Sequence, residues 1–394
     1  MAVVVQKFGG ATVESTTKIA KVASRILEQR KKGDSLIVVV SAMGRTTDSL
    51  LELAQELSDE PPLREMDALL NTGEMISMSL LSIALNSKNC PAIGLCGHQA
   101  GIVTDRFFSN ASIAEINTKR IREALSKDQV VIVAGFQGQT EDGELTTLGR
   151  GGSDTTALAL AASLQADRCE ILKDVPAIFS ADPRVLPDAH PIQELNYDQL
   201  LEMTYWGAKV LQYRSVEIAK HFQVPLYVGP AHSQDLGTFI QEKKMIEDSE
   251  ILALNSHETV LQIATPQKSL NGALKWLRQD LDARKIPFPQ LLHSELINGT
   301  VQLFITGPNE VMKSILGTSE QRKREPYIRE LSSVTATCRG STRPETMEKV
   351  IDSLETKGVK IRNLLVSAMS VTVFVEKALR ISAIHLLHKL VQTA

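Results

Sequence analysis

The sequence predicts an α/β protein in which a mostly parallel sheet, with helices on both faces, is followed by a smaller α+β region. Over roughly the first 230 residues, short and continuously apolar runs alternate with segments of helical periodicity. Such runs are typical of strands buried on both faces. After about Gly237 this pattern changes, which indicates a second folding region.

Six apolar runs are the predicted strands, at residues 2–8, 35–43, 90–97, 129–138, 169–175 and 224–229. Amphipathic helices are predicted between them. In the first of these helices, Ile19, Val22 and Ile26 recur at helical spacing, with charged residues on the other side. This alternation favours a parallel sheet whose ligand-binding loops gather at the carboxyl ends of the strands.

The second region looks like a duplicated unit. Residues 234–250 are polar and charged and fit a connector better than a further strand of the sheet. Beyond them, residues 271–307 and residues 344–377 each show a helical pattern followed by two strands joined by a short turn. The sequence therefore predicts two domains, at 1–245 and 246–394. The second would hold two modules, at about 255–318 and 328–394, which are consecutive or interleaved, and a single irregular α+β domain is the alternative.

Composition excludes several classes of protein. A net charge of −3 gives no electrostatic reason to expect nucleic acid or a membrane as partner. The four scattered cysteines, Cys90, Cys96, Cys169 and Cys338, predict reduced core thiols rather than a disulfide scaffold or a metal site. No stretch approaches the roughly 20 apolar residues of a membrane span, and no basic region precedes a long apolar run at the N-terminus. We therefore predict a cytoplasmic protein.

Two glycine-rich stretches are candidates for anion binding. Lys7, Gly9 and Gly10 follow the first strand, and a glycine pair beside a lysine lets the backbone approach an anion. The alternative is a tight turn with a solvated lysine. The stretch GRGGSD at 149–154 precedes a long apolar helix, whose free N–H groups also favour anions. Here the alternative is a glycine loop with Ser153 or Asp154 as a simple N-cap, and the stretch does not match the GxxxxGK[ST] pattern.

Six motifs in the same order together resemble the aspartokinase family, a branch of the amino acid kinases. They are KFGG (7–10), VVVSAMGRTTDSL (38–50), NTGEMIS (71–77), GFQGQTEDGELTTLGRGGSDTTALALA (135–161), KDVPAIFSADPRVLPDA (173–189) and WGAKVLQYRSVEIA (206–219). The resemblance implies an αβα sandwich as catalytic domain at 1–245, with the amino acid kinase fold. It implies that ATP, with Mg²⁺, phosphorylates the β-carboxylate of L-aspartate to 4-phospho-L-aspartate, the first step towards lysine, threonine and methionine.

The resemblance also implies a regulatory region of two ferredoxin-like ACT domains, which bind an amino-acid effector. These domains imply a homodimer, and a higher oligomer stays open. The effector loops expected before the two C-terminal helices read KSLNG and RGSTRPE here, so regulation is in doubt. Two other functions are open: a non-catalytic paralogue that binds ATP or an amino acid, and a kinase for another acidic amino acid.

Carried over residue by residue, the resemblance implies roles for three sets of residues. The catalytic set is Lys7, Asp154 and Lys209. The set that binds aspartate is Ser41, Thr47, Glu74, Arg150 and Ser153. The set that binds ATP is Lys7, Gly9, Gly10, Lys173, Asp174, Phe179, Arg184 and Lys209. No metal ligands are expected, because Mg²⁺ would bridge phosphate oxygens mainly through water.

Simpler interpretations compete for some of these residues, and the sequence departs from the family pattern at several positions. Glu74 could be an acid at a helix N-terminus, Arg184 a surface ion pair, and Ser41 and Thr47 turn or cap residues. The departures are Ala11, Lys173, Phe179 and the pair Gln212–Tyr213. Lys173, in place of a threonine, adds charge beside the nucleotide. None of the departures removes a charge that the reaction needs.

Overall fold

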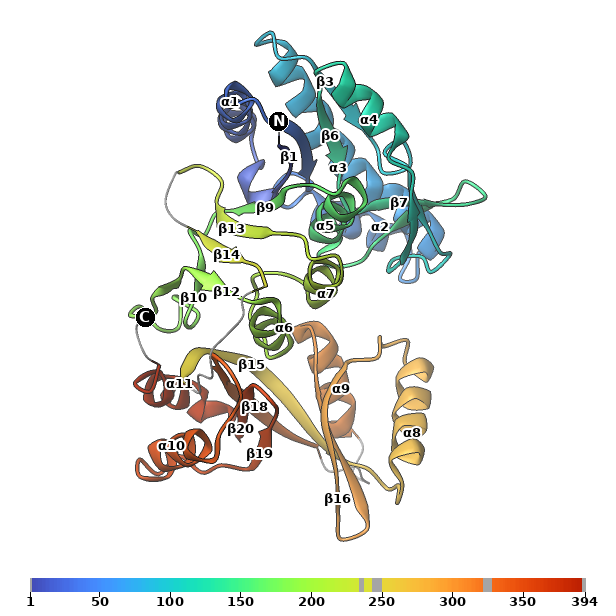
Figure 1. Ribbon diagram of the computed structural model, residues 1–394. Coiled ribbons are helices and arrows are strands. Elements are labelled where there is room, and N and C mark those ends of the chain that lie inside the picture. The colour runs from blue at the N-terminus through green and yellow to red at the C-terminus, as the bar shows by residue number, and fades with distance from the viewer. Residues whose placement is uncertain (1, 234–236, 243–249, 322–327, 392–394) are drawn as a thin grey trace. The chain divides into compact units, whose positions relative to one another are not determined.

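In the computed structural model, the described residues are 2–233, 237–242, 250–321 and 328–391. The chain divides into two compact units, each with its own sheet (Figure 1). The N-terminal unit comprises Met1–Phe179, Pro191–Thr204 and Lys209–Lys244. The C-terminal unit comprises Ser180–His190, Tyr205–Ala208 and Met245–Ala394.

The N-terminal unit is built on an eight-stranded sheet with the strand order β12-β14-β13-β9-β1-β2-β6-β3. Neighbouring strands are parallel, except that β13 and β14 are antiparallel. The strands are β1 (Val3–Phe8), β2 (Ser35–Val40), β3 (Ala92–Leu95), β6 (Val130–Ala134), β9 (Arg168–Lys173), β12 (Glu194–Leu195), β13 (Leu226–Pro230) and β14 (Thr238–Ile240). Each of the six predicted apolar runs overlaps one of these strands, so the prediction of a mostly parallel sheet is confirmed.

Helices cover both faces of this sheet. Those up to residue 221 are α1 (Thr16–Lys31), α2 (Thr46–Leu57), α3 (Leu63–Asn86), α4 (Lys119–Ser126), α5 (Gly152–Leu164), α6 (Tyr197–Tyr205) and α7 (Tyr213–His221), with a 3-10 turn η1 (Gly10–Thr12). Phe8 and Leu172 share a core with α1 and α3, whereas α5 packs against β1, β2 and β9. Because successive strand residues point to opposite faces, Lys7 and Lys173 lie on the face that α5 covers.

A smaller four-stranded sheet, in the order β5-β4-β7-β8, packs against α3. Its strands are β4 (Ile102–Thr104), β5 (Ile113–Ile116), β7 (Gln137–Thr140) and β8 (Leu145–Thr147), and β10 (Ile178–Phe179) pairs with β11 (Pro191–Ile192). By length and composition α3 could cross a membrane, since its most apolar window has a mean hydropathy of 1.4, with 44% of that window buried. The sequence alone does not predict a membrane span here, because polar residues interrupt the apolar run of this helix.

One predicted connector is partly wrong. Residues 238–240, inside the expected connector at 234–250, form β14, while 234–236 and 243–249 lie outside the described residues. Thr238 and Ile240 are buried and Phe239 is exposed, which is the alternation of a strand with one covered face. A strand of three residues is too short to give a periodic signal among polar neighbours.

The C-terminal unit is built on a six-stranded antiparallel sheet in the order β16-β17-β15-β18-β20-β19. Its elements are β15 (Ile251–Ala264), α8 (Leu270–Ala283), β16 (Gln290–Ile297), β17 (Thr300–Thr306), α9 (Asn309–Gln321), β18 (Ile328–Cys338), α10 (Pro344–Glu355), β19 (Asn363–Val366), β20 (Ser370–Glu376), η2 (Lys377–Leu379) and α11 (Arg380–His388). Both copies therefore follow the predicted order of a helix and two strands.

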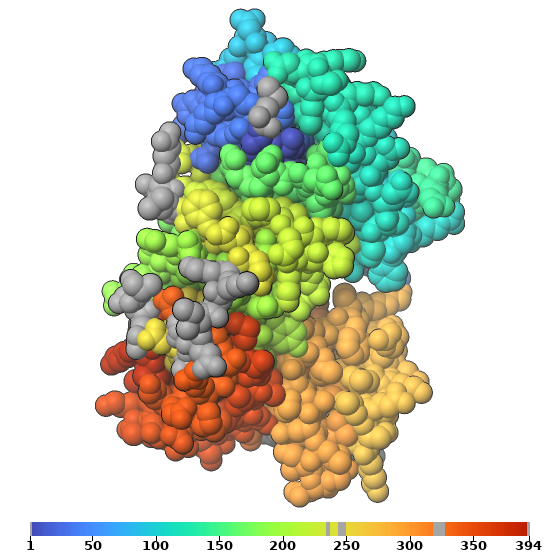
Figure 2. Space-filling view, viewed as in Figure 1, coloured from blue at the N-terminus to red at the C-terminus, as the bar shows by residue number. Residues whose placement is uncertain are grey.

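The two copies meet at the centre of this sheet, where β15 pairs with β18 and Asn255 lies opposite Thr335. Figure 2 shows them side by side, with the first copy in gold and orange and the second in red. Each copy contributes three adjacent strands to one half of the sheet.

Candidate active site

The end of β1 brings a lysine and two glycines to the carboxyl edge of the large sheet. Lys7 is only 7% exposed, so the interpretation as a solvated lysine is wrong. A Cβ built on Gly9 would stand 3.8 Å from Lys7 Nζ, and one on Gly10 would stand 2.8 Å from the Ala42 carbonyl oxygen. The second distance is too short for any side chain, so the position of Gly10 requires glycine.

Lys7 forms a buried ion pair with Asp154. Lys7 Nζ lies 2.6 Å from Asp154 Oδ1, and the two side chains are 8% and 6% exposed. Asp154 lies in the first turn of α5, where the positive end of the helix dipole also favours a carboxylate. Burial opposes ionisation of Asp154, but the ammonium groups of Lys7 and Lys173 outweigh it and lower the pKa of the carboxyl.

Lys173, the last residue of β9, joins the same cluster. Its Nζ is 3.9 Å from Asp154 Oδ2 and donates a hydrogen bond to the Val210 carbonyl. Burial lowers the pKa of the Lys173 ammonium, although the Asp154 carboxylate counteracts part of this effect. The cluster therefore holds two ammonium groups around one carboxylate, an excess of positive charge that suits a bound anion.

Glu74 lies in the middle of α3, so its interpretation as an acid at a helix N-terminus is wrong. It is 4% exposed, and its Oε1 accepts a hydrogen bond of 3.1 Å from the Ala42 N–H. Its buried Oε2 has no hydrogen-bond partner among the described residues. Burial raises the pKa of the Glu74 carboxyl to about 7. A cationic ligand group would satisfy both the free oxygen and the charge.

Ser41 lies beside α3 on the loop after β2, and Thr47 lies at the start of α2. The Ser41 N–H donates to the Phe8 carbonyl at 3.2 Å, and the Ser41 carbonyl accepts from Ser77 Oγ at 2.7 Å. Thr47 is the second residue of α2 and is half-buried. The backbone of Ser41 is thus fixed by the neighbouring strand and by α3.

The glycine loop before α5 is shaped by two residues with positive φ, Gly149 at +74° and Gly151 at +70°. Between them Arg150 is exposed, whereas Ser153 is buried in the first turn of α5. Gly151 is the N-cap of this helix, so the interpretation of Ser153 or Asp154 as the N-cap is wrong. Arg150 is therefore an exposed residue on the loop directly before the helix that carries Asp154.

The remaining residues predicted for the nucleotide are less closely tied to this cluster. Asp174 follows β9 and is exposed, Phe179 ends β10 and is half-buried, and Lys209 is exposed. Arg184 belongs to the C-terminal unit and makes a two-pronged contact with Asp182, at 3.0 and 2.7 Å. Arg184 therefore forms a surface ion pair in this structure.

Sequence reasoning missed a polar stripe that holds α3 in place. Asp67 is fully buried and accepts hydrogen bonds from the N–H groups of Ser109 and Thr147. Asn71 donates to the Asp67 carbonyl at 2.6 Å. Because Asp67, Asn71 and Glu74 recur at helical spacing in an apolar helix, that spacing was the available signal.

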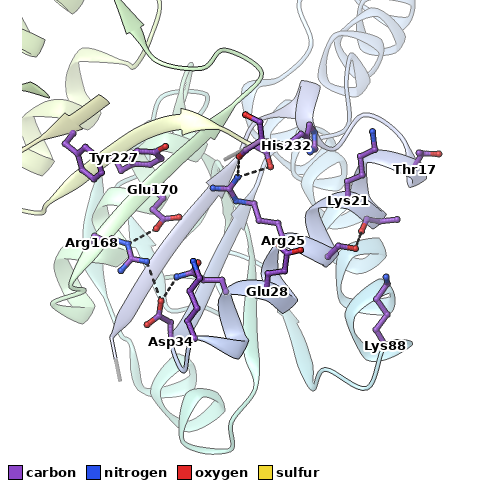
Figure 3. A pocket seen from close by; sticks show the side chains of 17 residues that line it. Thr17, Lys21, Arg25, Glu28, Asp34, Lys88, Arg168, Glu170, Tyr227 and His232 are labelled. Atoms are coloured by element: carbon purple, nitrogen blue, oxygen red, sulfur yellow. Dashed lines mark hydrogen bonds and ion pairs between the residues drawn. The ribbon is translucent and has the colours of Figure 1, made fainter. Parts of the chain in front are cut away.

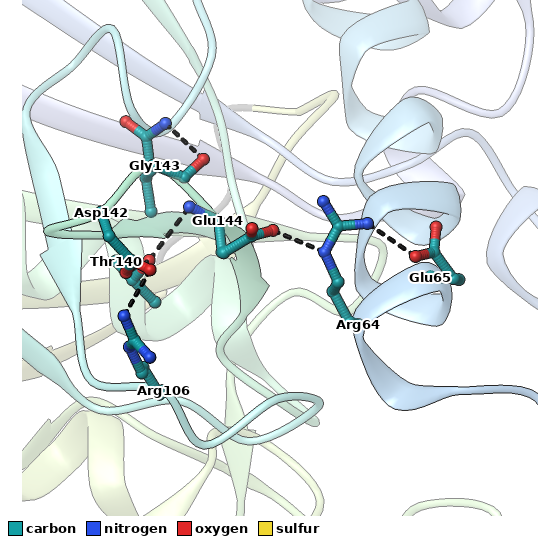
Figure 4. Close-up of polar contacts among 8 residues, drawn as sticks. Arg64, Glu65, Arg106, Thr140, Asp142, Gly143 and Glu144 are labelled. Carbon is teal, nitrogen blue, oxygen red and sulfur yellow. Dashed lines mark hydrogen bonds and ion pairs between the residues drawn. The ribbon is translucent and has the colours of Figure 1, made fainter.

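Exposed ion pairs at the start of α3 support the same arrangement (Figure 4). Arg64 contacts Glu65 and, across to the β7–β8 hairpin, Glu144, each at 2.6 Å. Arg106 contacts Asp142 on the same hairpin. Such exposed pairs contribute little energy individually, so the buried stripe of Asp67 and Asn71 carries more of the positioning.

A cavity of about 1220 Å³ lies elsewhere, between α1 and the sheet at β9, β13 and β14 (Figure 3). Arg25 and Arg168 are already engaged there, by the Ala231 carbonyl and by Glu170. None of the predicted site residues lines this cavity. The buried cluster of Lys7, Asp154 and Lys173 is the better candidate for the active site. Burying charged groups costs free energy, and buried groups with shifted pKa values gather at functional sites.

The geometry can be compared with known proteins. The model of the amino acid kinase family matches residues 2–230. An aspartokinase of Bacillus sp. (strain MGA3) is 37% identical, over 99% of this chain and 97% of that relative. An aspartate kinase of Pseudomonas putida is 35% identical, over 98% and 97%.

Among solved structures, E. coli aspartokinase III in complex with aspartate and ADP aligns with a TM-score of 0.79 at 23% identity, over 98% of this chain and 99% of that one. The aspartate kinase from Synechocystis aligns with a TM-score of 0.57 at 34% identity, over 98% and 69%. The first similarity shows a shared fold.

Proposed function

Because the chain belongs to the amino acid kinase family, within its aspartokinase branch, we propose that it transfers the γ-phosphoryl group of ATP to the β-carboxylate of L-aspartate. The product would be 4-phospho-L-aspartate. The observation that carries the proposal is the buried cluster in which Lys7 and Lys173 flank Asp154 beside the glycine pair.

The cluster supplies the electrostatic part of such a reaction. A carboxylate acceptor is ionised near pH 7, since an unperturbed aspartate titrates near pH 4, so no general base is required. The protein must bring two anions together and neutralise the charge of the transferring phosphoryl group. We assign Lys7, with the backbone of Gly9 and Gly10, to the phosphates. Asp154 holds Lys7 in place, and Lys209 supplies a second ammonium from the segment before α7.

A separate group of residues is suited to the amino-acid substrate. The free Oε2 of Glu74 can accept a hydrogen bond from the α-ammonium, and that charge would compensate the buried carboxylate. Arg150 can hold the α-carboxylate with two parallel hydrogen bonds. Ser41, Thr47 and Ser153 complete this group.

We assign Asp174 and Phe179 to the nucleotide side, with Lys173 beside them at the end of β9. Mg²⁺ would arrive with the nucleotide and neutralise phosphate charge. In the described part of the chain no group of three or more His, Cys, Asp or Glu side chains could hold a metal ion. We expect the ion to be held mainly by phosphate oxygens and water.

We further propose that residues 1–245 form the catalytic domain and 246–394 a regulatory region of two ACT domains. The antiparallel sheet ends in β16 and β19, where Leu296, Ile297 and Val366 are exposed. Exposed edges of this kind favour pairing with a second copy. A homodimer through these edges is therefore expected, and light scattering after gel filtration would measure it. We also propose a cytoplasmic location.

Trapping of the acyl phosphate with hydroxylamine tests the proposed reaction. The purified protein is incubated with ATP, Mg²⁺ and a panel of acidic amino acids, and the hydroxamate is quantified. We expect product with L-aspartate and not with glutamate. Arg150→Lys should raise the KM for aspartate tenfold or more, on the roughly 1.5–3 kcal/mol scale of a charged hydrogen bond. Product with none of the panel would favour a non-catalytic paralogue, and product with another acid would change the substrate.

A further inference from the structure

Lys173 has a contact that its charge alone does not explain. At 3.9 Å its Nζ is beyond hydrogen-bond distance from Asp154 Oδ2, so this attraction is purely electrostatic. Its described hydrogen bond is donated to the main-chain carbonyl of Val210. That carbonyl lies in the residue directly after Lys209.

The segment from Lys209 to Gln212 is held at its other end as well. The side chain of Gln212 packs on the glycine loop so closely that a Cβ on Gly151 would stand 1.8 Å from Gln212 Cγ. The helix that follows, α7, is tied to α5 by a hydrogen bond of 3.1 Å between Ser215 Oγ and Thr155 Oγ1. Lys209 itself is exposed, so the fixed backbone on its C-terminal side decides where its ammonium can reach.

We propose that Lys173 is a positioning residue, which fixes the Lys209–Gln212 segment through the Val210 carbonyl and so holds Lys209 where the nucleotide phosphates bind. The Lys173 side chain is 20% exposed, and it loses conformational entropy when it is fixed in the hydrogen bond to the Val210 carbonyl. Asp154 offsets the cost of burying the ammonium, because it lies on the same side of the sheet. The inference rests on the proposed function, since it gives Lys209 a role in binding ATP.

A double-mutant cycle of Lys173→Met and Lys209→Met tests this role. The KM for ATP, the kcat and the affinity for ADP are measured for both single variants and for the double variant. We expect each single variant to raise the KM for ATP by about tenfold, with a smaller change in the KM for aspartate. In the Lys209→Met background, the further effect of Lys173→Met should fall below about twofold, because residues that act through one contact are not additive.

Two further variants keep the test decisive. Lys173→Arg retains a donor for the carbonyl and should restore most of the affinity for ATP. Lys220→Met removes a lysine of α7 that forms an exposed ion pair with Asp198 of α6. It should leave all parameters unchanged. If Lys173→Met does not fold, Lys173→Ala takes its place in the cycle with the same expected effects, because it also removes the donor to the Val210 carbonyl.

Additive losses in the cycle would mean that Lys173 contacts the nucleotide directly, and the positioning role would be overturned. A Lys209→Met variant with normal affinity for ATP would overturn it too. In both cases trapping of the acyl phosphate from aspartate would still succeed, so the failure of this inference is distinguishable from failure of the proposed function.

Discussion

The two units of this protein treat buried polarity in different ways. In the N-terminal unit the charged side chains of Lys7, Asp67, Glu74, Asp154 and Glu170 are buried. In the described part of the C-terminal unit the buried polar side chains are those of serine, threonine and asparagine. Both units have a sheet as their core, so the presence of a sheet does not explain the difference.

Hydroxyl groups satisfy the antiparallel sheet locally. Thr335 Oγ1 and Thr372 Oγ1 share a hydrogen bond of 2.8 Å across neighbouring strands, and Thr306 Oγ1 donates to the Thr259 carbonyl, also at 2.8 Å. Such pairs leave no charge to be compensated. Burying an ion, in contrast, has a desolvation penalty of several kcal/mol, and the attraction to its partner offsets this penalty only when the geometry is good. Three of the five buried charged residues, Lys7, Glu74 and Asp154, belong to the proposed active site. Asp67 and Glu170 are instead held by hydrogen bonds and an ion pair within the N-terminal unit.

The largest expected effect comes from breaking the buried ion pair. Lys7→Ala should lower kcat by about a hundredfold or more, the scale of losing one preorganised charge. It should also lower the free energy of unfolding by about 3–5 kcal/mol, because Asp154 is left buried without its closest partner. Steady-state kinetics and denaturant titration measure the two effects.

The matched control for this variant lies in the C-terminal unit. Lys377 forms an exposed pair with Glu330, with side chains 42% and 36% exposed. Lys377→Ala should cost less than about 1 kcal/mol and leave kcat unchanged. Equal destabilisation by the two variants would contradict the difference between the units.

The next effect concerns Glu74. Glu74→Gln should raise the KM for aspartate by about tenfold or more, because the charged partner of the α-ammonium is lost. In the wild-type protein the affinity for aspartate should rise as the pH increases through about 7, where Glu74 ionises. Calorimetric titrations with aspartate between about pH 5.5 and 8, a range that spans this pKa, should show the rise in affinity. The Glu74→Gln variant should not show it.

The same group predicts a pH dependence of stability. The pKa of Glu74 is raised from 4.5 to about 7 in the folded protein, so the folded state binds more protons than the unfolded state in this interval. Its contribution to stability should be complete below the lower value and be lost as the pH rises through about 7. Glu65→Gln, an exposed acid on the same helix, is the control and should change neither slope.

A smaller effect compares two glycines with similar backbone geometry. Gly151 and Gly358 have φ values of +70° and +73°, but no atom lies within 4 Å of a Cβ on Gly358. Gly358→Ala should cost about 1–2 kcal/mol, the price of left-handed backbone. Gly151→Ala should cost at least about 1 kcal/mol more, from the contact with Gln212, and should also reduce activity. Gln212→Ala in the same chain should recover part of the loss.

The smallest expected effect is on regulation. One backbone donor of each predicted effector segment is already engaged: the Gly272 N–H, in the first turn of α8, donates to Ser269 Oγ, and the Thr342 N–H, before α10, donates to the Ala368 carbonyl. An effector shifts activity only through unequal affinity for two states. Lysine and threonine, alone or together at low millimolar concentration, should therefore inhibit weakly or not at all. A sigmoidal loss of most activity below about 1 mM would show that the loops bind despite these contacts.

The sequence by itself determined the order of the strands along the chain and the places where chemistry-bearing residues leave them. Continuous apolar runs predicted the buried parallel strands, and the glycines around Lys7 and Arg150 marked two anion-binding loops. It also predicted the repeated helix and two strands of the C-terminal unit. These features are local, because propensity, periodicity and turn chemistry are properties of neighbouring residues.

Only the tertiary structure decided which of these residues meet. The pairing of Lys7 with Asp154 joins residues 147 positions apart, from strand β1 and helix α5. The middle position of Glu74 in α3 and the bond from Lys173 to Val210 likewise depend on how helices pack on the sheet. Burial and electrostatic coupling are set by contacts between elements distant in sequence, so spacing along the chain could not predict them.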